Sequence, residues 1–247
     1  MLVKAIKTRP LIPPKDDLLS ALVESFSRCK LKERSIIVVT SKVVSIWEGM
    51  CINKDNSKIE KDKIIKNEAN LYIERQAQLP ESVMLTIKDN ILIPSSGIDE
   101  SNAKEHYILW PKKPFVSAKK IYNFIKKQYG LAELGIIITD SHTTPLRKGI
   151  MGIGLAYYGF NPLRDYRGKK DIFGRKLKMS RTNIVDSLAA AAVYEMGEGA
   201  EQTPIAIIED VDNIEFSEKK FESLRIDINE DIYSPLLKSA KWRKGGK

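Results

Sequence analysis

Hydrophobic positions recur at the period of an α-helix in several parts of the chain. Between Asp16 and Ser27, leucine, valine and phenylalanine return every three or four residues, which predicts an amphipathic helix. The same spacing over Ser117–Tyr129 predicts a surface helix, with lysines on its polar positions. Two more helices are expected, over Glu60–Gln78 and Thr182–Met196.

Short runs of apolar, β-branched residues predict buried strands. The longest is Ser35–Ile46, with a turn near Ser41 and Lys42 as an alternative. Gly135–Thr139 is wholly apolar and is followed at once by Asp140, as when a central strand delivers polar groups to a site at its carboxyl end. Further strands are expected over Val83–Lys88, Ile91–Pro94, His106–Trp110, Ile150–Tyr158 and Pro204–Glu209. The alternation predicts an α/β or α+β fold with mixed sheets.

Composition narrows the class of protein. The 247 residues are 43% hydrophobic and 30% charged, which is typical of a globular chain with one large domain or two small intertwined ones. No apolar run is long enough for a bilayer, and the first residues lack a secretory signal, so a cytoplasmic protein without membrane contact is expected. Cys29 and Cys51 are interpreted as buried, reduced packing residues.

The chain is basic, with 41 Lys and Arg against 32 Asp and Glu and a net charge of +9. Lysines concentrate in Lys112–Lys127 and in the tail after Lys238, and such clusters attract phosphates. A solvated lysine-rich surface is the favoured interpretation of the first cluster. We expect one unit over residues 1–240 and a basic tail over 241–247, whose last residues, Lys-Gly-Gly-Lys, are predicted to fray.

Four polar segments interrupt the apolar framework: Thr40–Lys42, Ser95–Asn102, Thr139–Gly149 and Met196–Pro204. Together they contain carboxylates, hydroxyls, a lysine and flexible glycines. Carboxylates bind magnesium or manganese, while lysine and backbone amides bind phosphates. Since the chain lacks a Walker A loop and a Rossmann fingerprint, these residue types indicate only a phosphate-handling enzyme.

Each polar segment also has a structural interpretation. Asp99 could cap a turn, and Asp140 with Ser141 could begin the next element. Gly197 could simply end a helix. His142 could be a packing or surface residue.

The order and spacing of several motifs resemble one family, the γ-glutamyl ligases that add glutamate to coenzyme F420-0, together with bacterial relatives assigned to folates. The resemblance extends from Pro10 to about Ile208. Its motifs are Ser96–Asn102, Ile137–Ser141, Arg147–Gly149 with Gly152 and Gly154, Asp171–Leu177, Asp186–Ala192 and Met196–Glu198.

The resemblance implies an α/β ligase of two intertwined subdomains that forms a homodimer. Its substrates would be GTP, L-glutamate and a carboxylate acceptor, either F420-0 or a folate. Phosphoryl transfer would give an acyl phosphate, which the glutamate amine attacks. Two Mg²⁺ or Mn²⁺ sites are implied, with K⁺ as a further candidate ion, and nucleic acid is not implied as a partner.

Site residues follow from the same resemblance. Asp99 and Asp140 match the catalytic carboxylates on one metal, and Ser141 matches a ligand of a second. Glu198 stands at that second metal, where many members have Gln. His142 and Arg147 are candidates for acceptor binding. The nucleotide contacts would be Pro10, Leu11, Ile12, Ser41, Lys42, Asn102, Met196, Gly197, Gly199, Ala200 and Thr203.

Two departures from the family pattern affect the prediction. Ile46 occupies a position where members usually have a lysine, which removes a phosphate or base contact. The residues after Asp140, Ser-His-Thr-Thr-Pro, also differ from the Thr-x-Gly-Arg of the deazaflavin-coenzyme ligases. The alternatives are therefore a non-catalytic nucleotide- or RNA-binding protein on this fold, or a family member without turnover.

Overall fold

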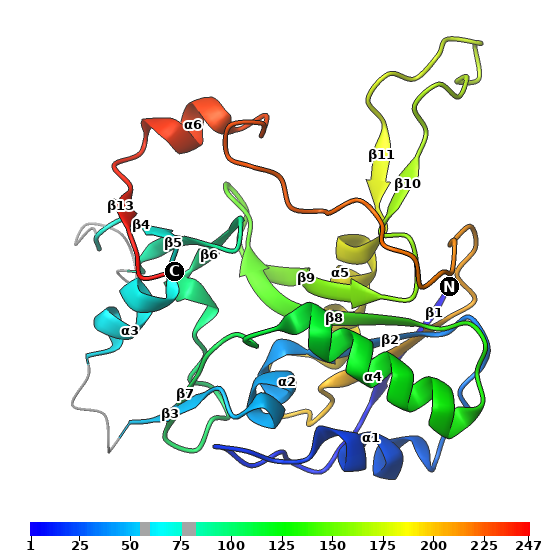
Figure 1. Cartoon of the computed structure of the whole chain (residues 1–247), viewed down its shortest axis with the longest axis horizontal. Helices are drawn as coiled ribbons and strands as arrows, with labels where there is room; N and C mark the ends of the chain where they lie inside the picture. The colour runs from blue at the N-terminus through cyan, green and yellow to red at the C-terminus, as the bar shows by residue number, and fades with distance from the viewer. Residues whose placement is uncertain (55–59, 76–82) are drawn as a thin grey trace.

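A five-stranded sheet forms the centre of the computed structural model, which describes residues 1–54, 60–75 and 83–247 (Figure 1). Its strand order is β1-β12-β2-β8-β9. β2 and β8 are parallel, and every other neighbouring pair is antiparallel. The strands are β1 (Leu2–Ile6), β2 (Ile36–Thr40), β8 (Gly135–Thr143), β9 (Ile150–Tyr158) and β12 (Ile205–Glu209).

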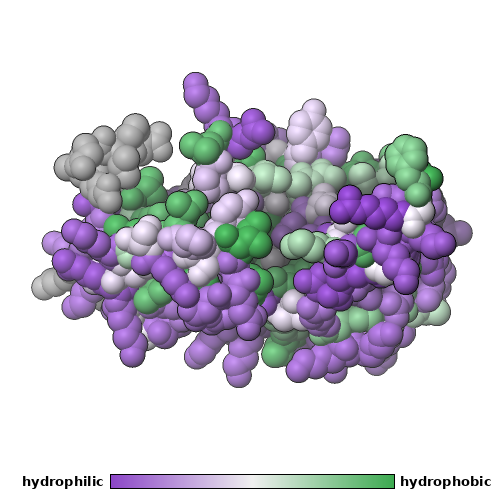
Figure 2. All heavy atoms as spheres, turned by 90° about the horizontal axis from the view of Figure 1, so that it is seen from above, coloured by the Kyte–Doolittle hydropathy of each residue, from purple (hydrophilic) through white to green (hydrophobic). Residues whose placement is uncertain are grey.

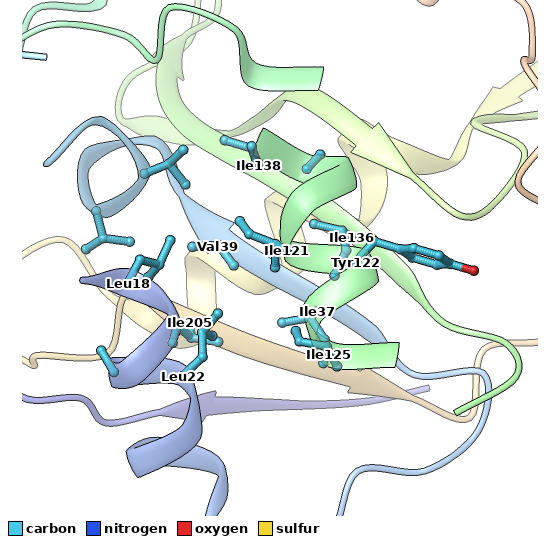
Figure 3. Packing of buried hydrophobic residues seen from close by; sticks show 14 of the residues in the cluster. Leu18, Leu22, Ile37, Val39, Ile121, Tyr122, Ile125, Ile136, Ile138 and Ile205 are labelled. Atoms are coloured by element: carbon cyan, nitrogen blue, oxygen red, sulfur yellow. The ribbon is translucent and has the colours of Figure 1, made fainter. Parts of the chain in front are cut away.

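Helices cover both faces of this sheet because its side chains alternate between two hydrophobic clusters. Ile37 and Val39 of β2 pack under α1 (Leu18–Phe26) and α4 (Pro114–Tyr129), as Figure 3 shows. Ile36 and Val38 belong instead to the cluster that contains α5 (Ile184–Met196). Since both faces are buried, the first four residues of β2 are all apolar, as the sequence predicted, and the strand ends at the half-buried Thr40.

Smaller sheets arise mostly from the part of the chain between β2 and β8. One has the order β13-β4-β5-β6, and a second pairs β3 with β7. A short 3₁₀ turn, η2 (Ser95–Gly97), follows β6. The elements of this region are β3 (Cys51–Asn53), α3 (Lys61–Glu68), β4 (Leu71–Tyr72), β5 (Leu85–Lys88), β6 (Ile91–Pro94), β7 (His106–Ile108) and β13 (Arg243–Lys244).

A long hairpin projects from the body of the molecule (Figure 1). It is formed by β10 (Leu163–Asp165) and β11 (Arg181–Asn183) with the segment between them. Over 163–183 the chain has eight Lys or Arg and two Asp, so this hairpin carries most of the net charge. Ile172 and Phe173 are 91% and 88% exposed on it.

The face seen in Figure 2 is mostly hydrophilic, with small hydrophobic patches. Lysines of α4 lie on its solvent side while Ile121 and Ile125 are fully buried, as predicted. Among the described residues, no helix is both long enough and apolar enough to cross a bilayer. The C-terminal segment contains one further short helix, α6 (Ser234–Ser239).

The segment Ser35–Ile46 is not one strand. After β2 the chain turns at Thr40 into α2 (Ser41–Glu48), which ends at Gly49 with a positive φ of 76°. Val43, Val44 and Ile46 face the core at helical spacing, so tertiary packing overrides their β-propensity. The alternative of a turn near Ser41 is therefore the correct one.

The chain also differs from prediction after Glu60. The helix there ends at Glu68, and β4 follows, so the predicted helix over 60–78 is too long; its residues 76–78 lie outside the described ones. The predicted frayed end is wrong, because β13 pairs with β4 and the backbone N–H of Gly246 donates to the Lys66 carbonyl. Cys29 and Cys51 are free but only half-buried. The division at residue 240 stays a prediction.

Candidate active site

A cavity of about 420 Å³ lies where the carboxyl ends of β2 and β8 meet the small-sheet region. This volume is in the range of small-molecule sites. Five segments line it: Thr8–Pro13, Thr40–Ile46, Asp99–Lys104, Thr139–Ser141 and Val193–Pro204. The four polar segments of the sequence therefore converge on one cavity.

Asp140 lies on β8, just after a register shift in its pairing with β9. The indole N–H of Trp110 donates to its Oδ2, and the Ser41 hydroxyl and the Ser141 backbone N–H also bond to the carboxylate. Burial, together with the nearby Asp99 charge, outweighs these donors and raises the pKa of Asp140 to about 6. The carboxylate is thus held by neutral donors, and none of the described Lys or Arg side chains forms an ion pair with it.

Asp99 follows η2 and has a different environment. Its Oδ2 forms an ion pair with Lys42 Nζ at 2.7 Å, and its Oδ1 accepts from the Ser101 backbone N–H and hydroxyl at 2.7 and 2.8 Å. Burial raises the pKa of Asp99, but the Lys42 ammonium and these hydrogen bonds lower it by more, so the carboxylate is ionised at neutral pH. Lys42 Nζ also donates to the Ser101 carbonyl at 2.9 Å.

The loop after α5 forms another wall of the cavity. Gly197, with φ 74°, ends the helix, and the Thr203 hydroxyl donates to the Met196 carbonyl at 2.6 Å. Asn102 Nδ2 donates to the Gly199 carbonyl at 2.8 Å and so joins this loop to the Asp99 turn. Ser141 Oγ donates to Glu198 Oε1 at 2.5 Å. The loop is therefore tied to both carboxylate segments.

The segment that contains Pro10, Leu11 and Ile12 is fixed by a charged pair. Arg9 binds the Asp16 carboxylate with two N–H groups at 2.8 and 2.9 Å, and the Ile12 backbone N–H donates to the same carboxylate. These contacts lower the pKa of Asp16 well below its usual range. The pair holds the segment against the cavity.

Most residues predicted for the site line this cavity. They are Pro10, Leu11, Ile12, Ser41, Lys42, Asp99, Asn102, Asp140, Ser141, Met196, Gly197, Glu198, Gly199, Ala200 and Thr203. The structure brings them together, while their individual roles stay predictions.

His142 and Arg147 are not among the residues that line the cavity. His142 is farther along β8, opposite Met151 of β9, and burial lowers its pKa although Asp186 acts in the other direction. Arg147 is exposed in the loop between these strands. Both follow Asp140 in sequence, His142 on β8 and Arg147 in the loop that leads to β9, and so lie past the residues that line the cavity.

Sequence reasoning missed several residues of the site. Trp110 was interpreted only as a strand residue, yet its indole contacts Asp140. Arg9, Ser101 and Lys104 line the cavity and neighbour predicted residues, so proximity in sequence was the available signal. Glu201 and Gln202 also line it, within the polar segment Met196–Pro204 that the sequence assigns to the site. Ile46 is 2% exposed and gives the wall an apolar patch.

The structural alternatives have separate outcomes. Asp99 does form the predicted turn through Ser101, and Gly197 does end a helix, so both residues have a structural contact as well as a place at the cavity. The N-cap interpretation of Asp140 is wrong because β8 continues to Thr143. The predicted end of that strand at Thr139 is also too early.

The residues present fit a divalent cation that arrives with a phosphate ligand. In the described ranges, no three His, Cys, Asp or Glu side chains form a metal cluster. Mg²⁺ is usually held by one or two carboxylates, water and substrate phosphates, so a complete protein cage is not required. Asp99, Asp140, Glu198 and the Ser141 hydroxyl offer such hard oxygen donors around one cavity.

A cavity that contains a carboxylate of raised pKa, at the strand ends of an α/β sheet, is the arrangement of an enzyme active site. The model of the F420-0:gamma-glutamyl ligase family matches residues 6–210. The chain belongs to this family, and it is an enzyme of the ligase class.

Curated relatives agree with this assignment. The chain is 35% identical over 214 residues to the coenzyme F420:L-glutamate ligase of Methanococcus maripaludis strain C7, which covers 81% of this chain and 84% of the relative. It is 32% identical over 228 residues to the enzyme of that name in Methanocaldococcus jannaschii, covering 86% and 89%. The Methanosarcina mazei relative is 30% identical over 221 residues, covering 84% and 85%.

Proposed function

We propose that the chain is a GTP- and divalent-metal-dependent ligase that joins L-glutamate to a carboxylate of coenzyme F420-0 through an acyl phosphate. The observation that carries the proposal is the gathering of Asp99, Asp140, Ser141 and Glu198 around one cavity in a chain of this family. The relatives' names supply the two substrates.

Nucleotide binding is assigned to the Lys42 side of the cavity. Lys42 lies in the first turn of α2, whose free backbone N–H groups favour an anion. Ile46, one turn later, offers apolar surface in place of a second cation, so Lys42 is the lysine of α2 available to a phosphate. Asn102 and the loop over 196–203 form the wall on which the nucleoside would rest.

Mg²⁺ or Mn²⁺ would be held by Asp99 and Asp140 at one site and by Ser141 and Glu198 at a second. A bound cation would offset the charge of the phosphates and of the acyl phosphate. The chain's own residues position the reactants: Asp140 is fixed by three donors, and Lys42 can exchange its carboxylate partner for a phosphate. K⁺ would be an additional activating ion.

The acceptor is assigned to the β8–β9 end of the cavity. His142 and Arg147 lie there beyond Asp140, and an extended anionic acceptor could contact both. Once the nucleotide and the acceptor fill the cavity, they would keep water from the acyl phosphate, which otherwise hydrolyses before the glutamate amine attacks.

The test is acceptor-dependent phosphate release. Purified protein is incubated with GTP, Mn²⁺ and L-glutamate, and either F420-0 or a folate is added; ATP replaces GTP in a parallel series. Release with F420-0, together with a product heavier by one glutamyl group, is expected. Release with the folate alone would change the acceptor class, and no release with either acceptor would overturn the proposal.

A family member without turnover is the second candidate, and the buried Ile46 in place of a lysine favours it. Titration of GTP by calorimetry with and without Mn²⁺ separates the two. A working site binds GTP more tightly with the metal, whereas an inactive one loses this dependence.

We also propose a cytoplasmic homodimer. The hairpin of β10 and β11 supports dimerisation, since Ile172 and Phe173 are exposed at 91% and 88% and would be covered by a second copy. Sedimentation equilibrium of the wild type and of Phe173→Ser is the test. A wild-type protein that sediments as a monomer contradicts the dimer.

A further inference from the structure

Trp110 contributes a hydrogen bond to the site from the small-sheet region. It lies just after β7 and is 4% exposed, so its indole N–H is removed from solvent and needs an acceptor. That acceptor is Oδ2 of Asp140, on a different sheet. A hydrogen bond to an ionised carboxylate is stronger than one to a neutral group.

The indole has little freedom to turn away. Gly97 of η2 lies against its N–H edge with a positive φ of 68°, and a Cβ at this position would overlap the ring. Lys88 of β5 lies 5.3 Å from the ring centroid and is itself fixed by an ion pair with Glu68 at 2.7 Å. The small-sheet region therefore aims the N–H group at the carboxylate.

The donors around Asp140 come from three elements. The Ser41 hydroxyl is supplied by α2, the Ser141 N–H by β8 and the indole N–H by the segment after β7. Of these donors, Trp110 alone comes from the small-sheet region. Donors from separate elements fix the plane of a carboxylate and decide which lone pairs remain for a ligand.

Trp242 shows what a purely structural indole does in this chain. It is half-buried in the C-terminal segment, and its N–H donates to the backbone carbonyl of Leu237 at 2.5 Å. Each indole N–H has an acceptor, but the acceptor of Trp110 is a side chain of the site and that of Trp242 is a backbone carbonyl outside it. Trp242 is therefore a matched control for the loss of an indole N–H.

We propose that Trp110 is a positioning residue for Asp140, whose indole N–H holds Oδ2 so that the carboxylate presents its free lone pairs to a divalent cation carried by the nucleotide. The inference deepens the proposed function and rests on it. The indole acts only as a hydrogen-bond donor and takes no part in bond making or breaking.

The test compares Trp110→Phe with Trp242→Phe. Phe keeps an aromatic ring and removes the donor. Free Mn²⁺ is measured by electron paramagnetic resonance while protein and GDP are titrated. Loss of a partner behind a metal ligand typically weakens binding about 10- to 100-fold. We expect that loss for Trp110→Phe and wild-type affinity for Trp242→Phe.

Turnover provides a second readout that a general loss of packing would not reproduce. For Trp110→Phe, the KM for Mn²⁺ should rise by the same factor while the KM for L-glutamate stays unchanged, and raising Mn²⁺ should restore kcat. Equal Mn²⁺ affinity in the wild type and Trp110→Phe would overturn the inference but leave the proposed function standing. No Mn²⁺ binding by the wild type with GDP would instead overturn the metal assignment.

A third protein separates the hydrogen bond from the packing if Trp110→Phe unfolds. It carries 3-benzothienylalanine at position 110, which keeps the two-ring shape and replaces N–H by sulfur. Weaker Mn²⁺ binding with an unchanged Tm supports the inference, and wild-type affinity overturns it.

Discussion

The two carboxylates at the centre of the site have opposite electrostatic environments. Asp140 belongs to the large sheet, is surrounded by neutral donors, and has its pKa raised by burial to about 6. Asp99 belongs to the small-sheet region, is paired with the Lys42 ammonium, and has its pKa lowered. Identical side chains on two sides of one cavity therefore differ in how firmly they hold negative charge.

This difference suggests separate tasks. Asp99 is already neutralised by a cation of the protein, so a ligand must displace or share Lys42. Asp140 has no such partner among the described residues, so a cation that binds beside it must also favour its ionised form. A buried carboxylate without a cationic partner lowers the stability of the metal-free protein, and it increases the affinity for a cation that binds beside it.

The largest effect is expected from Asp140→Asn. The change removes the charge without altering volume, and the amide oxygen can still accept from Trp110. Ligase activity should fall at least about 100-fold, as for loss of a charged group at a metal site. Phosphate release measures this, with circular dichroism as the check on folding.

Asp165→Asn is the matched control, because this exposed carboxylate lies on the projecting hairpin and pairs with Arg167. It should retain wild-type activity. Near-normal turnover in Asp140→Asn would remove Asp140 from the metal site.

Lys42→Met should have the next largest effect. It deletes the ion pair with Asp99 and the cation assigned to a phosphate. A hydrogen bond to a charged group contributes about 1.5–3 kcal/mol, so GTP affinity should fall about 10- to 100-fold. Calorimetry measures it, and Lys127→Met on the exposed face of α4 is the control. Equal losses in both variants would indicate a general effect of charge.

The pH dependence of stability should separate the carboxylates in the metal-free protein. Asp140 has a folded-state pKa above its unfolded value of 3.8, so its contribution is present below that value and is lost as pH rises through about 6. The loss amounts to about 2–3 kcal/mol. Asp99, with a lowered pKa, contributes above 3.8 and loses its contribution as pH falls.

Urea unfolding at about pH 5 and about pH 8 tests this difference. Relative to the wild type, Asp140→Asn should gain stability between the two pH values, since it removes a carboxylate that is costly to ionise. Asp99→Asn should show no such gain. Parallel profiles for the wild type and Asp140→Asn would contradict the raised pKa.

Glu198→Gln should have the smallest effect. Gln still accepts a hydrogen bond from Ser141 and matches the residue of many family members. Activity should therefore stay within about threefold of the wild type, because a single exposed charged contact contributes little free energy. The preference between Mn²⁺ and Mg²⁺ is the quantity to measure. A loss comparable to that of Asp140→Asn would place Glu198 among the essential ligands.

Much of the fold was predictable because hydrophobic spacing is local information. The predicted bounds of β6 and β9 equal the observed ones, whereas α1 is shorter than predicted at both ends and α4 begins three residues earlier than predicted, at Pro114. The split of Ser35–Ile46 was not predictable from propensity, since Val43 and Val44 favour strands and only their packing on the core decides for a helix. The pairing of β13 with β4 joins segments far apart in sequence and leaves no local signal.

The site was predictable where polar residues follow strands or glycines, as at Asp140 and Gly197. It was not predictable where a residue of ordinary packing chemistry contacts the site. The sequence around Trp110 indicates only a core residue, whereas its contact with the site depends on the direction of its indole N–H group. His142 and Arg147 lie outside the cavity because β8 continues past Asp140 instead of turning.

The order of the strands also constrains how the chain folds. β2 and β8 form the parallel pair of the large sheet, although the whole segment 41–134 separates them in sequence. β1, near the N-terminus, pairs with β12, which begins only at Ile205. Closing long loops costs entropy before contacts are gained, and high contact order slows folding. Prior collapse of the inserted segment would shorten the effective loop, so the small-sheet region is expected to set the rate at which the large sheet assembles.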